Sequence, residues 1–186
     1  MTRLHGLLLA AGSGTRMGKP KALVRDADDT SWLRRAVAVL QHGGCQAVTV
    51  VLGAGADEAA PILAGTGVDV VVAEDWAEGM GASLRAGLRG IAGSGALAAV
   101  VMLVDLPDVT ADVVRHVAKR VTRADQLVRA SYAGRPGHPV VIGRAHWAAV
   151  ADSVSGDQGA REYLASHGVV DVDCDHLATG RDRDRP

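Results

Sequence analysis

The chain has 186 residues, of which 48% are hydrophobic and 22% are charged, and its formal net charge is −1. This length and composition predict one globular domain that spans residues 1–186 and can bury a core. The near-zero charge gives no basic field for nucleic acid, and no apolar run approaches the roughly 20 residues of a membrane span, so we expect neither as a partner.

The cysteines and the N-terminal sequence indicate the cellular compartment. Cys45 and Cys174 are the two cysteines, and their positions match no metal-binding spacing, so we expect buried, unreactive thiols. Met1 leads directly into strand-like sequence without the features of a secretory leader. These observations favour a reducing, cytoplasmic setting.

Seven short runs rich in Val, Leu and Ala predict strands in chain order. They lie at residues 5–11, 46–53, 68–74, 97–105, 126–132, 138–143 and 169–173. Continuous apolar runs are typical of strands that are buried on both faces. Proline and glycine cluster near residues 134–139, which predicts either a loop or an antiparallel strand beside a ligand cleft.

A helical pattern follows the first strand and its loop. Thr30 or Ser31 can cap this helix, and Gly43 can end it. The residues predicted to face the core are Trp32, Leu33, Ala36, Val37 and Leu40.

A second helix is predicted from Thr110 or Asp112 through Val121. The alternation of strands and helices predicts an α/β fold, a single-domain Rossmann-like three-layer sandwich with a mostly parallel central sheet.

The loop after the first predicted strand reads LLLAAGSGTRMGKPKAL over residues 7–23. Ligands of open α/β sheets bind at the carboxyl ends of strands, where this loop lies. Three glycines would let backbone N–H groups approach an anion: Gly12, Gly14 and Gly18. Three cations add positive charge at the same place: Arg16, Lys19 and Lys21.

Two known phosphate-binding loops do not fit this segment. A Walker A loop needs GxxxxGK[ST], but Met17 stands where its second glycine belongs and Pro20 follows Lys19. A Rossmann fingerprint needs GxGxxG at the start of a helix, but the spacing here is GxGxxxG and Pro20 interrupts any helix. Three cations suit a triphosphate, and the alternative is a solvated surface turn.

The segment MLVDLPDV contains a second candidate site. Asp105 ends a strongly apolar strand, and Pro107 prevents that strand from continuing. A carboxylate at the carboxyl end of a central strand lies beside the first loop, and nucleotide-bound Mg²⁺ takes one or two such carboxylates. The alternative is that Asp105 caps a turn or the next helix, and we expect a structural role for Asp108.

The loop sequence LAAGSGTRMGKPKAL resembles the signature of nucleotidyltransferases that act on sugars and on molybdopterin, roughly LAAGxGxRMGxPKxL. EGMGASLRAGL at 78–88, VDLPDV, GRPGHPVVIGRAHW at 134–147 and GDQGAREYL at 156–164 extend the resemblance over nearly the whole chain. Within this group, the chain resembles the molybdenum cofactor cytidylyltransferases and their actinobacterial relatives. The resemblance implies the fold of the nucleotide-diphospho-sugar transferases and a dependence on Mg²⁺.

The resemblance also implies roles for single residues. The nucleotide would lie on Ala10, Ala11, Gly12, Ser13 and Gly14. Arg16 and Lys21 would hold the triphosphate and stabilise charge at the α-phosphorus, and Asp105 would bind Mg²⁺; these three are the candidate catalytic residues. Ser83 would help enclose the nucleotide, with a helix N-cap as its alternative.

On the acceptor side the resemblance points to His138 and Arg161, and His138 could instead be structural at the start of a strand. Within the family, LAAG rather than LAGG accompanies CTP rather than GTP. Trp76, after a strand's carboxyl end, is the tryptophan best placed to stack on a ring, with core or lid packing as the alternative.

The end of the chain departs from the family pattern. The family usually ends in DxDTPEDL, with a second metal-binding Asp and a closing helix, whereas this chain reads ATGRDRDRP. Asp182 and Asp184 align with the two aspartates, so Asp184 is the second candidate metal ligand. Arg185 replaces Thr, and composition predicts a flexible tail over residues 178–186.

The predicted reaction is the transfer of a nucleoside monophosphate, CMP from CTP, to a phosphorylated acceptor such as molybdopterin, with a molybdoenzyme or its chaperone as protein partner. The attacking phosphate oxygen is already an anion, so no general base is needed. A sugar phosphate or a small phospho-acid is an alternative acceptor. Two other classes remain: an oxidoreductase similar to nicotine blue oxidoreductase, and a non-enzymatic protein that delivers a nucleotide cofactor.

Overall fold

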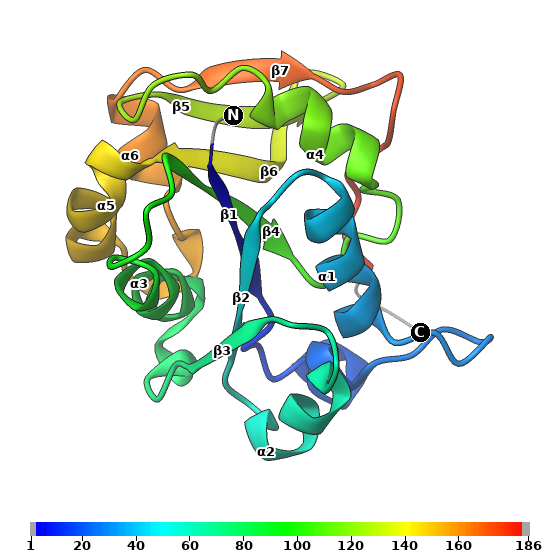
Figure 1. Cartoon of the computed structure of the whole chain (residues 1–186). Coiled ribbons are helices and arrows are strands. Elements are labelled where there is room, and N and C mark those ends of the chain that lie inside the picture. The colour runs from blue at the N-terminus through cyan, green and yellow to red at the C-terminus, as the bar shows by residue number, and fades with distance from the viewer. Residues whose placement is uncertain (1–2, 184–186) are drawn as a thin grey trace.

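The computed structural model describes residues 3–183, except for the side chain of Arg16. Figure 1 shows a twisted sheet between two layers of helices. The sheet has seven strands, in the order β3 (Asp69–Val72), β2 (Ala47–Leu52), β1 (Leu4–Leu9), β4 (Ala98–Leu103), β6 (Arg135–Gly143), β5 (Leu127–Tyr132) and β7 (Val170–Asp173). The predicted α/β three-layer sandwich is confirmed.

The strands coincide with the seven predicted runs to within a few residues. The strands β3, β2, β1 and β4 run parallel to one another, and β6 is antiparallel to both β4 and β5. The segment rich in proline and glycine is therefore the start of an antiparallel strand.

Six α-helices connect the strands. They are α1 (Trp32–His42), α2 (Ala56–Ala59), α3 (Met80–Gly90), α4 (Ala111–Ala118), α5 (Trp147–Ser153) and α6 (Arg161–Ser166), among residues 3–183. Short 3₁₀ turns are η1 (Thr15–Met17), η2 (Lys21–Leu23), η3 (Ala60–Leu63), η4 (Trp76–Glu78), η5 (Arg144–His146) and η6 (Gly156–Gln158).

The helix α1 begins and ends as the sequence predicts. The Ser31 side chain accepts a hydrogen bond from the Arg34 backbone N–H, and Gly43 is the C-cap. All five residues predicted to face the core are buried. In α4 the cap position is Thr110, but its side chain makes no capping bond, and the helix ends at Ala118 rather than at Val121.

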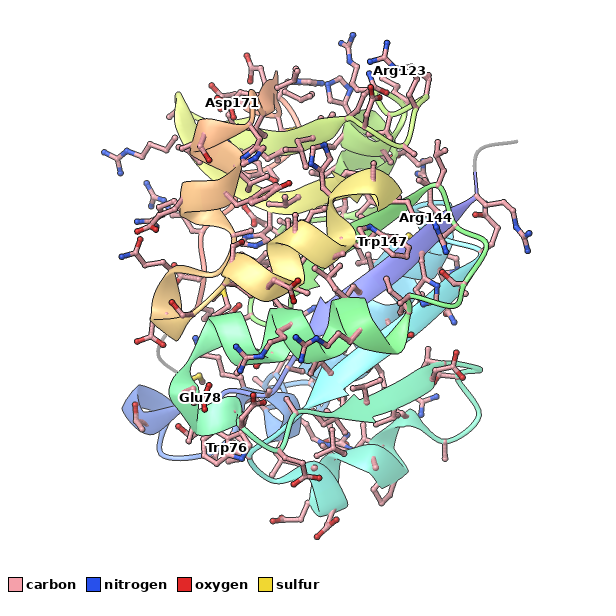
Figure 2. The ribbon with its side chains drawn as sticks, turned by 90° about the vertical axis from the view of Figure 1, so that its left-hand side faces the viewer. Trp76, Glu78, Arg123, Arg144, Trp147 and Asp171 are labelled. Atoms are coloured by element: carbon pink, nitrogen blue, oxygen red, sulfur yellow. The ribbon has the colours of Figure 1, made fainter. Side chains whose placement is uncertain are left out.

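The sheet separates two apolar cores. One lies under α1 and α4, and the other lies under α3, α5 and α6 on the opposite face (Figure 1). In the second core, Trp147 of α5 is buried and donates its indole N–H to the Ile142 carbonyl at 2.8 Å, with the Arg144 guanidinium over its ring (Figure 2). These layers fix the central strands and leave their carboxyl ends to the loops.

The prediction that the strands are buried on both faces was wrong at the edges of the sheet. Val70 and Val72 of β3 are 41% and 47% exposed, because β3 is an edge strand that the helical layers cover incompletely. Cys45 and Cys174 are buried free thiols, as predicted. None of the helices among residues 3–183 is long and apolar enough to span a membrane.

Candidate functional site

The two loops that the sequence singles out meet at the carboxyl ends of β1 and β4. These strands are parallel neighbours, and Leu9 pairs with Leu103 at their ends. Hydrogen bonds continue the ladder past the strands, since the Ala10 N–H donates to the Val51 carbonyl and the Val104 N–H donates to the Leu9 carbonyl. The glycine loop and the segment that carries Asp105 therefore leave the sheet side by side.

Gly12 and Gly14 have different roles in the glycine loop. Gly14 has a positive φ of 60°, and a Cβ there would lie 2.0 Å from the Lys19 carbonyl oxygen, so the turn requires glycine. A Cβ on Gly12 would meet nothing within 4 Å. The backbone at Gly12 faces open space, where a ligand can approach its N–H.

Lys21 and Asp105 form the central ion pair of this region. The Lys21 Nζ lies 2.5 Å from Asp105 Oδ2, and the two side chains are 21% and 9% exposed. A carboxylate this buried needs a cationic or hydrogen-bonding partner, because its desolvation is otherwise costly. Lys21 belongs to η2 and Asp105 follows β4, so the pair joins the two loops.

A pocket of about 390 Å³ opens above this ion pair. It is lined by the predicted nucleotide residues Ala10, Ala11, Gly12, Ser13, Gly14, Lys21 and Ser83, together with Asp105. The structure thus brings together every predicted nucleotide residue whose side chain it describes. The Arg16 side chain lies outside the described part of the chain.

The turn that leads into α3 forms the opposite wall of this pocket. Trp76 of η4 and Gly79 line it, and Figure 2 shows Trp76 on this turn beside Glu78. The N-cap of α3 is Gly79, so the alternative of Ser83 as an N-cap is wrong: Ser83 lies one turn inside the helix and is buried. Trp76 is half-buried and lies outside both apolar cores, although it packs against one of them.

A second pocket of about 400 Å³ adjoins the first. Both predicted acceptor residues, His138 and Arg161, line it, and it shares Leu9, Leu103 and Asp157 with the first pocket. Its floor is apolar and formed by side chains of β4, β6, α3 and α6, while its rim carries Arg129, Gln158 and Asp182. The two pockets also share Met80, so they adjoin along three apolar side chains and the Asp157 carboxylate.

His138 is neutral in this environment. Burial lowers the pKa of its imidazole to about 4, and the nearby Asp105 carboxylate raises that pKa only in part. The Tyr132 hydroxyl donates a hydrogen bond to the His138 carbonyl at 2.8 Å, which fixes the backbone at this point. At neutral pH the ring can donate or accept a hydrogen bond, but it carries no charge.

The C-terminal segment is held against the site as far as residue 183. The Thr179 N–H and hydroxyl both donate to Asp108 Oδ2, at 2.6 and 2.5 Å. Asp108 thereby has the structural role that the sequence predicts. Asp182 lines the second pocket, whereas Asp184, the other predicted metal ligand, lies outside the described residues.

Metal binding in the described part of the site would depend on few protein ligands. Among residues 3–183, no group of three or more His, Cys, Asp or Glu side chains could hold a metal ion. Mg²⁺ on a nucleotide needs one or two carboxylates, because phosphate oxygens and water complete its shell. Asp105 meets that need: Lys21 occupies Oδ2, and Oδ1 accepts no hydrogen bond from the described residues.

Two charged pocket residues that the sequence analysis did not single out are Asp157 and Arg129. Asp157 lines both pockets and lies inside the GDQGAREYL segment, so that segment carried a signal for it. Arg129, on β5, also lines the second pocket, and nothing in its local sequence distinguishes it from a surface arginine that pairs with Asp171.

Comparisons with known proteins agree with this geometry. Residues 6–172 match the model of the MobA-like NTP transferase domain. The chain is 36% identical to nicotine blue oxidoreductase of Paenarthrobacter nicotinovorans, over 96% of this chain and 91% of that protein. It is 32% identical to molybdenum cofactor guanylyltransferase of Rhodobacter capsulatus, over 79% of this chain and 67% of that protein.

Solved structures show the same architecture. Rv0371c from Mycobacterium tuberculosis H37Rv superposes with a TM-score of 0.83 at 31% identity, covering 99% of this chain and 94% of that one. A structure of Rv0371c in complex with manganese superposes with a TM-score of 0.76 at 30% identity, covering 93% and 89%.

Proposed function

The chain belongs to the MobA-like NTP transferase family, and we propose that this nucleotidyltransferase moves CMP from CTP to a phosphorylated acceptor, molybdopterin, and releases pyrophosphate. One observation carries the proposal. The Lys21–Asp105 pair lines the first pocket, and this pocket shares Leu9, Leu103 and Asp157 with the second pocket. A donor and an acceptor bound in these two pockets would meet where the pockets adjoin, with the ion pair on the donor side.

The first pocket suits a nucleoside triphosphate. Backbone N–H groups of the loop from Ala11 to Gly14 can approach phosphates, and Lys21 supplies positive charge. On the family pattern, Arg16 would add a second cation. Trp76 offers an aromatic face to a base or a ribose on the opposite wall. The Ala10-Ala11-Gly12 sequence favours CTP over GTP, on the family pattern.

Asp105 would hold Mg²⁺ together with the phosphate oxygens, and Asp184 would be a second ligand. When bound, this ion neutralises charge on the triphosphate. Asp105 fits because it presents a carboxylate oxygen at the pocket while Lys21 compensates its charge. The manganese complex of Rv0371c supports a divalent metal in this family.

The chemistry needs positioning and charge more than proton transfer. An oxygen of the acceptor phosphate attacks the α-phosphorus, a new P–O bond forms, and the bond to the β-phosphate oxygen breaks as pyrophosphate leaves. Arg16 and Lys21 stabilise the charge on the equatorial and departing oxygens. Arg161 compensates the negative charge of the acceptor phosphate. Neutral His138 orients this phosphate by a hydrogen bond and forms no ion pair with it.

One comparison favours a second candidate function. The 36% identity to nicotine blue oxidoreductase, over nearly both full lengths, supports an oxidoreductase that uses NAD(P)H or a bound flavin. The glycine loop has no dinucleotide fingerprint, and its three cations exceed what a pyrophosphate on a helix N-terminus requires. We therefore rank it below nucleotidyl transfer, and we rank a cofactor-delivery protein lower still.

Thermal unfolding separates these candidates. CTP, GTP, ATP and NADPH are added in turn, each with and without Mg²⁺. A ligand at about 100 times its dissociation constant adds about 2.7 kcal/mol to the free energy of unfolding. For a domain of this length, that raises the unfolding midpoint by roughly 5–11 °C. A Mg²⁺-dependent shift with CTP supports the proposal. A shift with GTP or ATP alone keeps the reaction and discards cytidine, and a shift with NADPH alone favours the oxidoreductase.

A further inference from the structure

The segment after β7 contacts the loop that carries Asp105 and the turn that follows η2. Figure 1 shows the chain running from β7 past α4 towards the start of α1. On this path Thr179 donates two hydrogen bonds to Asp108, and the Arg183 N–H donates to the Asp105 carbonyl at 2.9 Å. The segment is therefore fixed to both ends of the loop that carries Asp105.

The guanidinium of Arg183 contacts two residues that follow η2 in the chain, Asp26 and Trp32. Its Nη1 lies 3.0 Å from Asp26 Oδ1, and its Cζ lies 5.7 Å from the centre of the buried Trp32 ring. Asp26 also accepts a hydrogen bond from Trp32 Nε1 at 2.8 Å and pairs with Arg35. Asp26 lies just beyond η2, the turn that carries Lys21.

Two further features show that this segment is fitted closely to the protein. Gly180 has a φ of 63°, and a Cβ there would lie 2.2 Å from the Tyr132 ring, so the backbone passes directly over that ring. The hydrogen bond from Trp32, together with Arg35 and Arg183, lowers the pKa of Asp26, which keeps it ionised and able to hold Arg183. Gly180 and Asp182 also form part of the second pocket.

We propose that residues 178–183 form a positioning strap, and that Arg183 is its positioning residue, which sets the separation between the Lys21 loop and the Asp105 loop. The backbone of Arg183 fixes one loop and its side chain fixes the other. A displacement of about 1 Å at reacting groups can lower a rate by roughly 100-fold, so weak contacts that set this separation matter. The inference rests on the proposed function, because it concerns the same site.

The variant that tests the strap is Arg183→Ala, and its matched control is Arg181→Ala. Arg181 has the same charge, lies two residues away, and makes no ion pair or hydrogen bond with the described residues. Hydrogen exchange of the full chain without ligand is measured for the peptide that spans residues 103–109. We expect faster exchange there in Arg183→Ala, an unchanged rate in Arg181→Ala, and unfolding midpoints equal in the two variants.

Activity provides the second measurement. We expect kcat for nucleotidyl transfer to fall about tenfold in Arg183→Ala, with a change in the KM for CTP of less than about threefold, since geometry and not binding is lost. Arg183→Lys should recover part of the loss by restoring the pair with Asp26. Asp26→Asn combined with Arg183→Ala should cost little more than Asp26→Asn alone, because Asp26→Asn already weakens the contact with Arg183.

The outcomes separate the strap from the proposed function. Equal exchange and equal kcat in Arg183→Ala and Arg181→Ala would overturn the strap, whatever the reaction is. If the unaltered protein transfers no nucleotide, the proposed function fails, and the exchange comparison alone then decides the strap. Faster exchange at residues 103–109 only in Arg183→Ala supports it in either case.

Discussion

The removal of either member of the Lys21–Asp105 pair should abolish most activity and leave the protein folded. Asp105 Oδ2 accepts a hydrogen bond from Lys21 Nζ at 2.5 Å, and the Asp105 side chain is only 9% exposed. A hydrogen bond to a charged group contributes about 1.5–3 kcal/mol, so Lys21→Ala should lower the free energy of unfolding by about 2 kcal/mol. A domain with a stability of about 5–15 kcal/mol remains folded after that loss.

The loss of catalysis should be larger than the loss of stability. Removal of one group that stabilises charge in the transition state typically costs about 10² in kcat, or roughly 2.7 kcal/mol. We expect this loss or more for Lys21→Ala and for Asp105→Ala. The double variant should lose far less than the product of both factors, since the two groups act as a unit.

The assay is steady-state release of pyrophosphate with CTP, Mg²⁺ and acceptor, alongside thermal unfolding of each variant. Lys119→Ala is the control, because it removes the same charge from an exposed position at the end of α4. The midpoint of Lys21→Ala should fall by roughly 4–8 °C for about 2 kcal/mol. Turnover close to that of the unaltered protein in Lys21→Ala or Asp105→Ala would refute the assigned roles.

Three further predictions follow from the site and the core. Added CTP with Mg²⁺ should quench the fluorescence of Trp76, which lines the first pocket while the other two tryptophans are buried, and Trp76→Phe should remove the quench. The folded-state pKa of His138, about 4, lies below its ordinary 6.5, so the unfolded chain binds the proton first as pH falls. The stability that this neutral imidazole contributes is complete above pH 6.5 and is lost towards pH 4, and His138→Gln should lack that part of the pH dependence in urea unfolding. Burial raises the pKa of Cys45 to about 12 and also raises the pKa of Cys174, so a thiol reagent at pH 8 should label both only on unfolding.

Each of these predictions has a contradicting result. A quench that persists in Trp76→Phe would place the nucleotide elsewhere. Identical pH dependence of unfolding in His138→Gln and the unaltered protein would mean that the imidazole is not held neutral. Rapid labelling of either thiol in the folded protein would show that the cores open more readily than the packing around Cys45 and Cys174 indicates.

The fold was accessible from the sequence because its signals are local and repeated. Apolar runs fix the strands within a few residues, and Ser31 and Gly43 mark the ends of α1. The residues of the first pocket were accessible for a related reason: Lys21 and Asp105 follow neighbouring parallel strands, so topology alone brings them together.

What the sequence did not reveal depends on long-range contacts. Composition predicts a flexible tail at 178–186, but Thr179 and Arg183 find partners more than 70 residues away. The exposure of Val70 depends on its strand lying at the sheet edge, which an apolar run cannot indicate. The alternative of Ser83 as a helix N-cap was wrong because the helix begins at Met80, a boundary that is set by the turn before it.

The most direct test of nucleotidyl transfer follows the α-phosphate itself. CTP labelled at that phosphate is incubated with the protein, Mg²⁺ and molybdopterin, and label and pyrophosphate are measured together. We expect one label to enter the acceptor for each pyrophosphate released, and we expect Asp105→Ala to abolish both. Label that stays in CTP, with GTP and ATP equally inert, would contradict this expectation.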